Sequence, residues 1–221
     1  MPAHFFYTHL FVSPNYLQIV TRFRDGEMRT FFLLVLALFC AVFSQKSDSL
    51  SRVLEHAIWQ TGVTVGYDPS YQKLNYPAGD VPLETGVCTD VIIRAFRAAG
   101  IDLQVLIHED MKAHFANYPQ IWGLERPDRN IDHRRVPNIA TYMQRIGKKL
   151  AVSKKGSEYI PGDLVTWKLP GNLDHIGIVV NVKVKGTDRF MVVHNIGQGA
   201  RMEDVMFAYE ITGHYRYWKK E

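Results

Sequence analysis

One cysteine and two histidines are of the types that nucleophilic catalysis uses when a fold brings them together. Cys88 stands near the start of GVCTDVIIRAFRAAGID, where apolar residues recur at helical spacing, so the sequence predicts a helix with Cys88 at its N-terminus. The unpaired N–H groups of a helix N-terminus and a nearby imidazolium both lower the pKa of a thiol. We therefore expect an ionised Cys88 that acts as a nucleophile beside a histidine.

The partner histidine has to come from a distant part of the chain. His175 opens a run of alternating apolar residues, and His194 lies near the end of the next such run. If Lys185 and Asp188 flank a two-residue turn, His194 pairs with Val179 on the face that carries His175. His175 would then lie roughly 13 Å further along the strand, so a bulge or a different turn must close the gap. We predict a catalytic role for His175 and leave His194 open between catalysis and structure.

The other histidines after residue 44 are better explained by surface or packing roles. They are surrounded by ordinary amphipathic or charged residues: His56, His108, His114, His133 and His214.

A short apolar segment near the N-terminus is typical of a secretory signal. Residues 31–43 are all apolar and follow Arg29, but they are too few for a bilayer, which takes about 20 helical residues. We predict that residues 1–44 are an N-terminal extension and a signal, with Met28 as the true start. The product would be exported to the periplasm or cell envelope, without a stable membrane span.

Composition narrows the class of protein further. The chain has 221 residues, two cysteines and a formal net charge of +4. These values exclude collagen-like, mostly disordered and disulfide-built proteins, and the charge is too small to imply nucleic-acid binding. Removal of the signal leaves Cys88 without an internal disulfide partner, so it is a buried apolar residue, a dimer bridge or a nucleophile.

The pattern of elements predicts an α+β fold. Helical spacing is found in 47–61, from Cys88 to Gly100, around 107–118 and after Pro137. Alternating β-branched and aromatic residues then predict the strands of an antiparallel sheet: 163–169, 175–184, 189–196 and 213–218. In the second strand, one face is expected to be core and the other polar. We expect a single domain over 45–221, with a helical or irregular insertion at about 101–160.

These motifs resemble two related families. The order of a helix-borne cysteine, then GDLV, HIGI and VVH is similar to that of the NlpC-type cell-wall peptidases, a papain-like group. The longer strings GVCTDVIIRAFRAAGIDLQ, HEDM, PDRNIDHRRVPN and PGDLVTW resemble the exported bacterial family called domain of unknown function 1287. The resemblance covers most of residues 60–218. It implies a papain-like fold whose nucleophile-bearing helix packs on a C-terminal antiparallel sheet.

The resemblance also implies roles for individual residues. Cys88 would attack an amide carbonyl, His175 would act as general base and later acid, and His194 would orient His175. The backbone N–H of Cys88 would contribute to an oxyanion hole. Tyr76 matches the position of a tyrosine that often lines the NlpC-type site, although a packing role is an equal alternative.

Other residues are candidates for substrate binding. Asp90 lies in the first turn of the cysteine helix, and Arg134 with Arg135 could recognise a carboxylate of a cell-wall peptide. A solvated surface is the competing explanation for this charged run. The chain has Val87-Cys88-Thr89-Asp90 where NlpC-type enzymes usually show Asp-Cys-Ser-Gly. This difference bears on the identity of the substrate more than on the type of reaction.

The leading hypothesis is a cysteine hydrolase that cuts an amide bond in peptidoglycan, as a stem-peptide endopeptidase or an amidase. The alternatives are a wall-binding or scaffold protein without catalysis and an acyltransferase that uses the same thioester. We expect no cofactor and no nucleic-acid partner. A metal site is the weaker alternative, because Cys88, His175 and His194 lack close ligand neighbours. The sequence indicates no particular oligomeric state.

Overall fold

The computed structural model describes residues 49–218, which belong to one compact unit. The predicted signal, the start at Met28 and the extension before it lie outside the described residues. Within 49–218, no helix is both long and apolar enough to cross a membrane.

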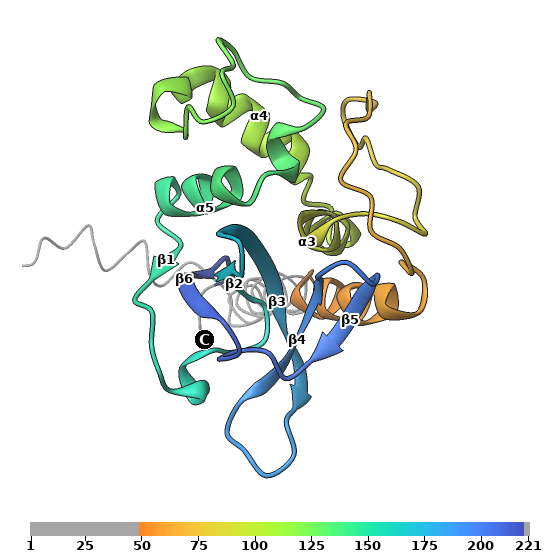
Figure 1. Ribbon diagram of the computed structural model, residues 1–221, viewed down its shortest axis with the longest axis vertical. Coiled ribbons are helices and arrows are strands. Elements are labelled where there is room, and N and C mark those ends of the chain that lie inside the picture. Colours follow the sequence, from red (N-terminus) through yellow and green to blue (C-terminus); the bar gives the residue numbers. More distant parts are fainter. Residues whose placement is uncertain (1–48, 219–221) are drawn as a thin grey trace, which may run out of the picture. The chain divides into compact units, whose positions relative to one another are not determined.

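The described strands form one antiparallel sheet, in the order β1-β6-β2-β3-β4-β5 (Figure 1). Their bounds are β1 Lys149–Leu150, β2 Asp163–Leu169, β3 Leu173–Lys183, β4 Phe190–Asn195, β5 Ala200–Glu203 and β6 Glu210–Arg216. The sequence predicted β2, β3, β4 and β6. It missed β1 and β5, which are too short to show a period.

The helices precede the sheet in sequence, which confirms the α+β class. A helix covers residues 49–59, and the others are α3 Cys88–Ala98, α4 Leu103–His114 and α5 Val136–Arg145. Short 3-10 turns are η1 Gln60–Gly62, η2 Phe115–Asn117, η3 Asp132–Arg134 and η4 Gly156–Glu158. The α4 helix begins before the predicted segment because the Asp102 side chain caps it by accepting from the Gln104 N–H.

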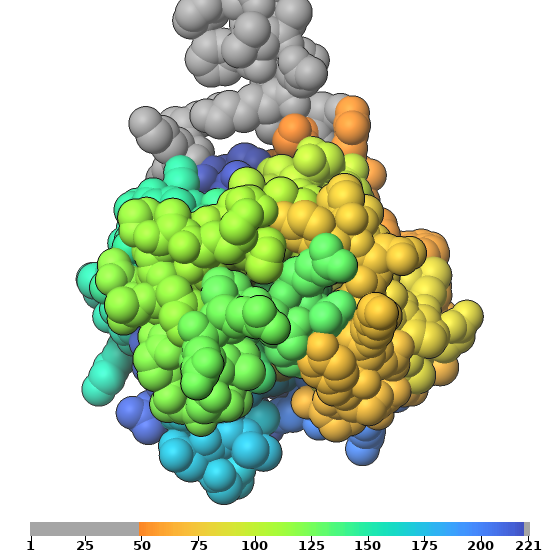
Figure 2. Space-filling view, turned by 90° about the horizontal axis from the view of Figure 1, so that it is seen from above, coloured from red at the N-terminus to blue at the C-terminus, as the bar shows by residue number. Residues whose placement is uncertain are grey.

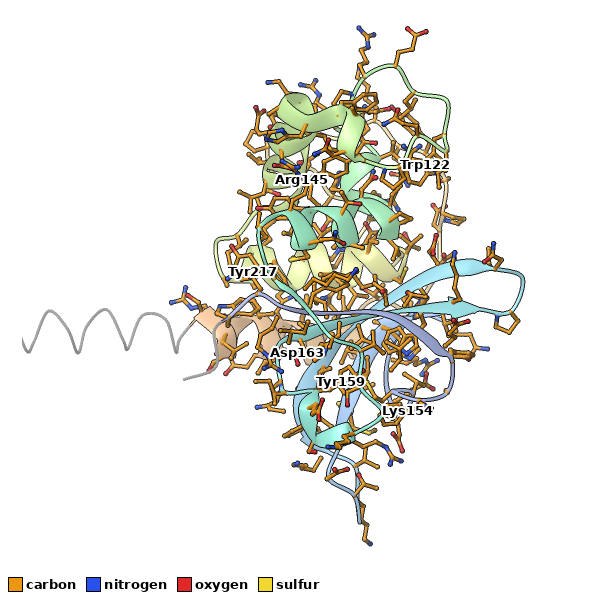
Figure 3. All side chains as sticks on the ribbon, turned by 90° about the vertical axis from the view of Figure 1, so that its left-hand side faces the viewer. Trp122, Arg145, Lys154, Tyr159, Asp163 and Tyr217 are labelled. Atoms are coloured by element: carbon orange, nitrogen blue, oxygen red, sulfur yellow. The ribbon has the colours of Figure 1, made fainter. Side chains whose placement is uncertain are left out.

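The larger core lies between the helices and one face of the sheet. Ile176, Ile178 and Val180 of β3 pack there with Val91 and Phe96 of α3. Figure 3 shows α4 and α5 stacked on this side. The arrangement implied by the NlpC-type resemblance, a cysteine-bearing helix on a C-terminal antiparallel sheet, is therefore confirmed.

The opposite face of the sheet is also covered, contrary to the prediction of a polar face. A second apolar cluster buries it, made of Tyr159, Val165, Trp167, Val179, Val192 and Met206. Tyr159 lies on the side of the sheet away from α4 and α5 (Figure 3). His175 alternates with the core residues of β3 and so shares this second face, where it is buried rather than solvated.

The segment at about 101–160, predicted as an insertion, contributes to the main core. Ile107 and Met111 of α4 and Ile139 and Met143 of α5 are all buried in it. Its loop lies beside the segment before α3, since the Leu74 N–H donates to the Asn130 side chain at 2.9 Å. Figure 2 shows the two as adjacent green and orange-to-yellow surfaces that cover the strands.

Candidate active site

A β-bulge brings the two histidines of the sheet together. Near the turn, Lys183 pairs with Phe190, which is the register that the sequence predicted. The register then shifts, so that Val179 pairs with Val192 rather than with His194. Continued along the strands, the shifted register places His194 two residues closer to His175 and keeps both on one face.

Gly177 makes this close approach possible. The shifted register places it opposite His194, and a methyl group there would lie 2.6 Å from Val192 Cγ1 and 3.2 Å from His194 Cβ. Because real side chains avoid such distances, only glycine leaves room for His194 beside β3.

The two imidazoles form a direct hydrogen bond. His175 Nε2 lies 3.0 Å from His194 Nδ1, and the rings meet nearly edge to face at 81°. Both side chains are buried, and Trp167 packs beside His175 at a ring distance of 5.9 Å. Burial, together with the neighbouring His194, lowers the pKa of His175 to about 3, so this ring is neutral at pH 7.

Cys88 lies at the N-terminus of α3 and beside the strand that carries His175. The backbone N–H groups of Ile176, Thr89 and Cys88 itself act on its sulfur and lower its pKa. These donors favour a thiolate, but burial disfavours it more strongly, and the Asp90 carboxylate adds to the penalty. The pKa of Cys88 is raised to about 12. The expectation of an ionised thiol is therefore wrong for the free protein, which holds Cys88 as a neutral SH group.

Asn195 links the histidine strand to the cysteine segment. Its side-chain amide donates to the carbonyls of Gly86 at 2.9 Å and Gly66 at 3.1 Å. Gly86 comes two residues before Cys88, and Asn195 directly follows His194. The buried amide thus fixes the start of α3 against the end of β4. Asn195 was not among the predicted site residues, and its one sequence signal is its place next to a candidate histidine.

A pocket of about 200 Å³ reaches Cys88 from the surface. Its walls come from the loop before α3, the segment before α5 and the start of β3. The lining residues are Tyr67, Pro69, Val87, Cys88, Trp122, Ile131, Arg134, Arg135, Val136, Pro137 and Asp174. Cys88 is 6% exposed, so the pocket gives limited access to the sulfur.

Tyr76 does not line this pocket, contrary to expectation. Its hydroxyl donates to Glu109 at 2.9 Å, and its ring packs edge to face against His108 of α4. Tyr67 is the tyrosine that lines the pocket, and its partial burial, together with the nearby Asp90 carboxylate, raises its pKa. Spacing from the cysteine therefore selected the wrong tyrosine in this loop.

Asp90 and Arg134 are engaged with each other rather than with a ligand. The Arg134 guanidinium donates two hydrogen bonds to the Asp90 carboxylate, at 2.9 and 3.0 Å, and both side chains are buried. Asp90 also accepts from the Val87 N–H at 2.7 Å and so caps α3. The expected substrate-binding role of these two residues is corrected to a structural one, although Arg134 borders the pocket.

Arg135 keeps a position suited to substrate contact. It lines the pocket, and its guanidinium carbon lies 4.1 Å from the centre of the Trp122 ring. One of its nitrogens also pairs with Asp132 at 3.0 Å. The planar cation is thus held between a ring and a carboxylate at the pocket wall.

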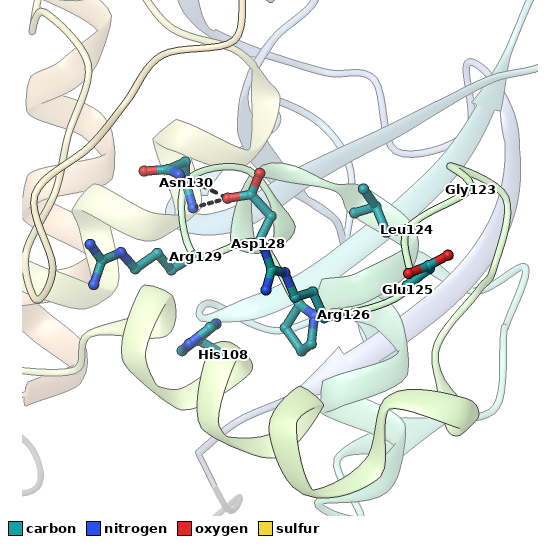
Figure 4. Close-up of a pocket in the computed structure, with 9 residues that line it drawn as sticks. His108, Gly123, Leu124, Glu125, Arg126, Asp128, Arg129 and Asn130 are labelled. Atoms are coloured by element: carbon teal, nitrogen blue, oxygen red, sulfur yellow. Dashed lines mark hydrogen bonds between the residues drawn. The ribbon is translucent and has the colours of Figure 1, made fainter.

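A second cavity of about 820 Å³ lies apart from Cys88, along the loop after Trp122 (Figure 4). Its lining consists of His108 and the consecutive residues 123–130. Asp128 and Asn130 bond to each other within it at 2.8 Å. It is larger than the Cys88 pocket but contains neither the thiol nor the paired histidines.

Comparison with known proteins identifies relatives. The chain is 52% identical over 169 residues to the uncharacterized protein YijF of Escherichia coli (strain K12). The aligned region covers 76% of this chain and 82% of YijF. A solved structure from Staphylococcus aureus subsp. aureus Mu50, described as similar to a lipoprotein of the NLP/P60 family, has 13% identity and a TM-score of 0.39. That match covers 78% of this chain and 42% of the other, so this chain spans less than half of that protein. The family model described as "Domain of unknown function (DUF1287)" matches residues 54–217, and the chain belongs to this family.

Proposed function

We propose that this protein is an exported cysteine hydrolase that cleaves an amide bond in peptidoglycan, with Cys88 as nucleophile, His175 as base and His194 as the orienting residue. The observation that carries the proposal is the hydrogen bond between His175 and His194 beside the strand whose Ile176 N–H contacts the Cys88 sulfur. A buried structural histidine needs no second imidazole, whereas a catalytic base needs a partner that orients it.

The ring nitrogens of His175 have different tasks in this scheme. Nε2 is bonded to His194, which leaves Nδ1 to take a proton from the thiol. Since the pKa of Cys88 is raised to about 12 and that of His175 is lowered to about 3, both groups are neutral before reaction. The proton therefore moves from sulfur to His175 Nδ1 as the sulfur attacks the carbonyl carbon, rather than beforehand.

The later steps transfer the acyl group of the substrate first to the Cys88 sulfur and then to water. Attack forms the C–S bond, and the carbonyl electron pair moves to oxygen, where the backbone N–H of Cys88 can donate to it. Collapse of this intermediate breaks the C–N bond, and the leaving amine takes the proton from His175. Water then attacks the thioester, giving its proton to His175, which returns it to the departing sulfur.

The pocket wall supports a peptide substrate with a carboxylate. Arg135 faces the pocket with its guanidinium already stacked on Trp122, so binding a carboxylate costs it little conformational entropy. Asp174 on the same wall offers a partner for an amine, although it also bonds Lys168 at 2.7 Å. Cell-wall stem peptides carry both kinds of group.

The test is mass spectrometry of peptidoglycan digested by the protein. We expect muropeptide products from the wild type and from His114→Ala, which alters an exposed histidine outside the pocket. Cys88→Ala and His175→Ala should release none while still binding the polymer. If Cys88→Ala retains full activity, the proposed nucleophile is wrong.

A binding or scaffold protein is the alternative, because the neutral, buried thiol is also what an inert cysteine shows. Binding by the wild type without any product would favour this alternative. Products joined to an added amine instead of water would indicate an acyltransferase that uses the same thioester.

A further inference from the structure

Glu203 extends the histidine pair by one more residue. His194 Nε2 lies 3.0 Å from Glu203 Oε2, on the side of the ring opposite the nitrogen that meets His175. Glu203 lies on β5, the strand at the edge of the sheet beside β4 (Figure 1). Its partner in the ladder is Val192, and it reaches His194 diagonally on the same face.

The two ends of this contact differ in exposure. The His194 side chain is 1% exposed, whereas that of Glu203 is 48% exposed. A carboxylate thus reaches from the surface to a buried ring nitrogen. No sequence signal pointed to Glu203, because β5 is four residues long and carries no motif.

The contact between His194 Nε2 and Glu203 Oε2 has the distance of an ion pair, but its alignment falls outside that of a hydrogen bond. An ionised carboxylate only accepts, so this contact favours a proton on His194 Nε2. A neutral imidazole has one N–H, so His194 Nδ1 is then an acceptor. The proton between the two rings must therefore belong to His175 Nε2, and His175 Nδ1 carries none.

We propose that Glu203 is a positioning residue that selects the tautomers of His194 and His175, so that His175 presents an unprotonated Nδ1 to the thiol of Cys88. The inference rests on the proposed function for its catalytic meaning, but the tautomers are a property of the free protein. Glu203 acts through His194 and touches neither the thiol nor the pocket described above.

Without an acceptor at Glu203, the opposite tautomers become accessible. His194 could then hold its proton on Nδ1 and donate it to His175 Nε2, which moves the His175 proton to Nδ1. That nitrogen could no longer take a proton from the thiol, so the base would be lost although every ring stayed in place. For histidines that bind a metal, loss of the outer partner that fixes the tautomer typically lowers activity by about 10- to 100-fold, and we expect a loss of that order here.

Nitrogen NMR of the full chain labelled with ¹⁵N at histidine tests this directly, because protonated and bare ring nitrogens have distinct shifts. In the wild type at pH 7, we expect both His175 and His194 to carry their proton on Nε2. In Glu203→Ala, a measurable share of both rings should carry it on Nδ1. Glu210→Ala, which removes an exposed carboxylate from β6, is the matched control and should leave both tautomers unchanged.

Two results would overturn the proposal: a wild-type His175 protonated on Nδ1, or a Glu203→Ala protein whose rings both stay fully protonated on Nε2. The first needs no variant, so it applies even if the substitution impairs folding. Activity gives a separate readout, in which Glu203→Ala should lower kcat about 10- to 100-fold with little change in KM. An inactive wild type with the expected tautomers would contradict the hydrolase and leave the role of Glu203 in the histidine pair intact.

Discussion

Asp90 and Arg134 are joined by two hydrogen bonds of 2.9 and 3.0 Å in the protein interior, where they connect the first turn of α3 to η3. The same guanidinium donates to the backbone carbonyls of Asp68 and Ser70 in the loop before α3. One side chain therefore joins the loop before α3, the first turn of α3 and η3, which all border the Cys88 pocket.

Arg134→Met should destabilise the protein strongly, because it leaves the buried Asp90 carboxylate without its cation. Removal of one partner of a buried ion pair typically costs about 3–5 kcal/mol in the free energy of unfolding. Urea unfolding at pH 7 measures this cost. Arg126→Met, at the separate larger cavity, is the control and should change stability little. A loss below about 1 kcal/mol for Arg134→Met would show that the pair is not structural.

Alkylation of Cys88 by iodoacetamide should be slow in the folded protein. The pKa near 12 leaves almost no thiolate at pH 8, whereas an ordinary thiol has a pKa of about 8.5. We expect a rate at least roughly 100-fold below that of the urea-unfolded chain, rising steadily up to pH 10. Mass spectrometry of the peptide that contains Cys88 measures the rate separately from Cys40. A fast reaction that levels off below pH 8.5 would instead indicate a resting thiolate.

Buried neutral histidines should make stability depend on pH below neutrality. Burial lowers the pKa of His133 to about 4 and that of His175 to about 3, and it also lowers the pKa of His194. The unfolded chain protonates these residues near pH 6.5, whereas the folded chain does not. The free energy of unfolding should therefore fall below pH 6.5, by up to about 1.4 kcal/mol per pH unit for each histidine.

Urea unfolding at pH 7, 6 and 5 measures this slope. His133→Leu should flatten it, because His133 is buried and its Nδ1 has no hydrogen-bond partner within the described residues. His114→Leu changes a half-exposed histidine and serves as the reference. Equal slopes for the two variants would contradict a neutral, buried His133.

Gly177→Ala should separate the two histidines of the site. The added methyl would lie 2.6 Å from Val192 Cγ1, so β4 has to shift together with His194. Overpacking of this kind costs about 1–3 kcal/mol, and hydrolysis should fall with it. Gly62→Ala is the matched control, since no atom lies within 4 Å of its added methyl. Unchanged stability and activity in Gly177→Ala would show that β3 and β4 need no glycine there.

Tyr67→Ala should impair hydrolysis more than Tyr76→Phe. Tyr67 lines the Cys88 pocket, whereas the Tyr76 hydroxyl bonds the exposed Glu109. We expect a higher KM for Tyr67→Ala and unchanged kinetics for Tyr76→Phe, measured on one muropeptide substrate. The reverse order would restore the role that the sequence assigned to Tyr76.

The sequence by itself determined the main helices, the longer strands and the core face of β3. Apolar spacing predicts the helix that begins at Cys88, and strict alternation around His175 predicts β3. Both patterns are local, because the spacing of apolar residues within a few turns of helix or a few residues of strand is enough to show them. Even the turn register at Lys183 and Phe190 was predictable, because two strands and a short turn define it.

The tertiary structure alone decided how the residues of the site meet. The bulge in β3 and β4 brings His194 to His175, and Glu203 reaches His194 from a strand too short to predict. The protonation of Cys88 also depends on the whole fold, since the helix N-terminus favours the thiolate but burial outweighs it. Each of these outcomes depends on contacts between residues far apart in the sequence. The periodicity of a segment indicates only which of its own faces is apolar.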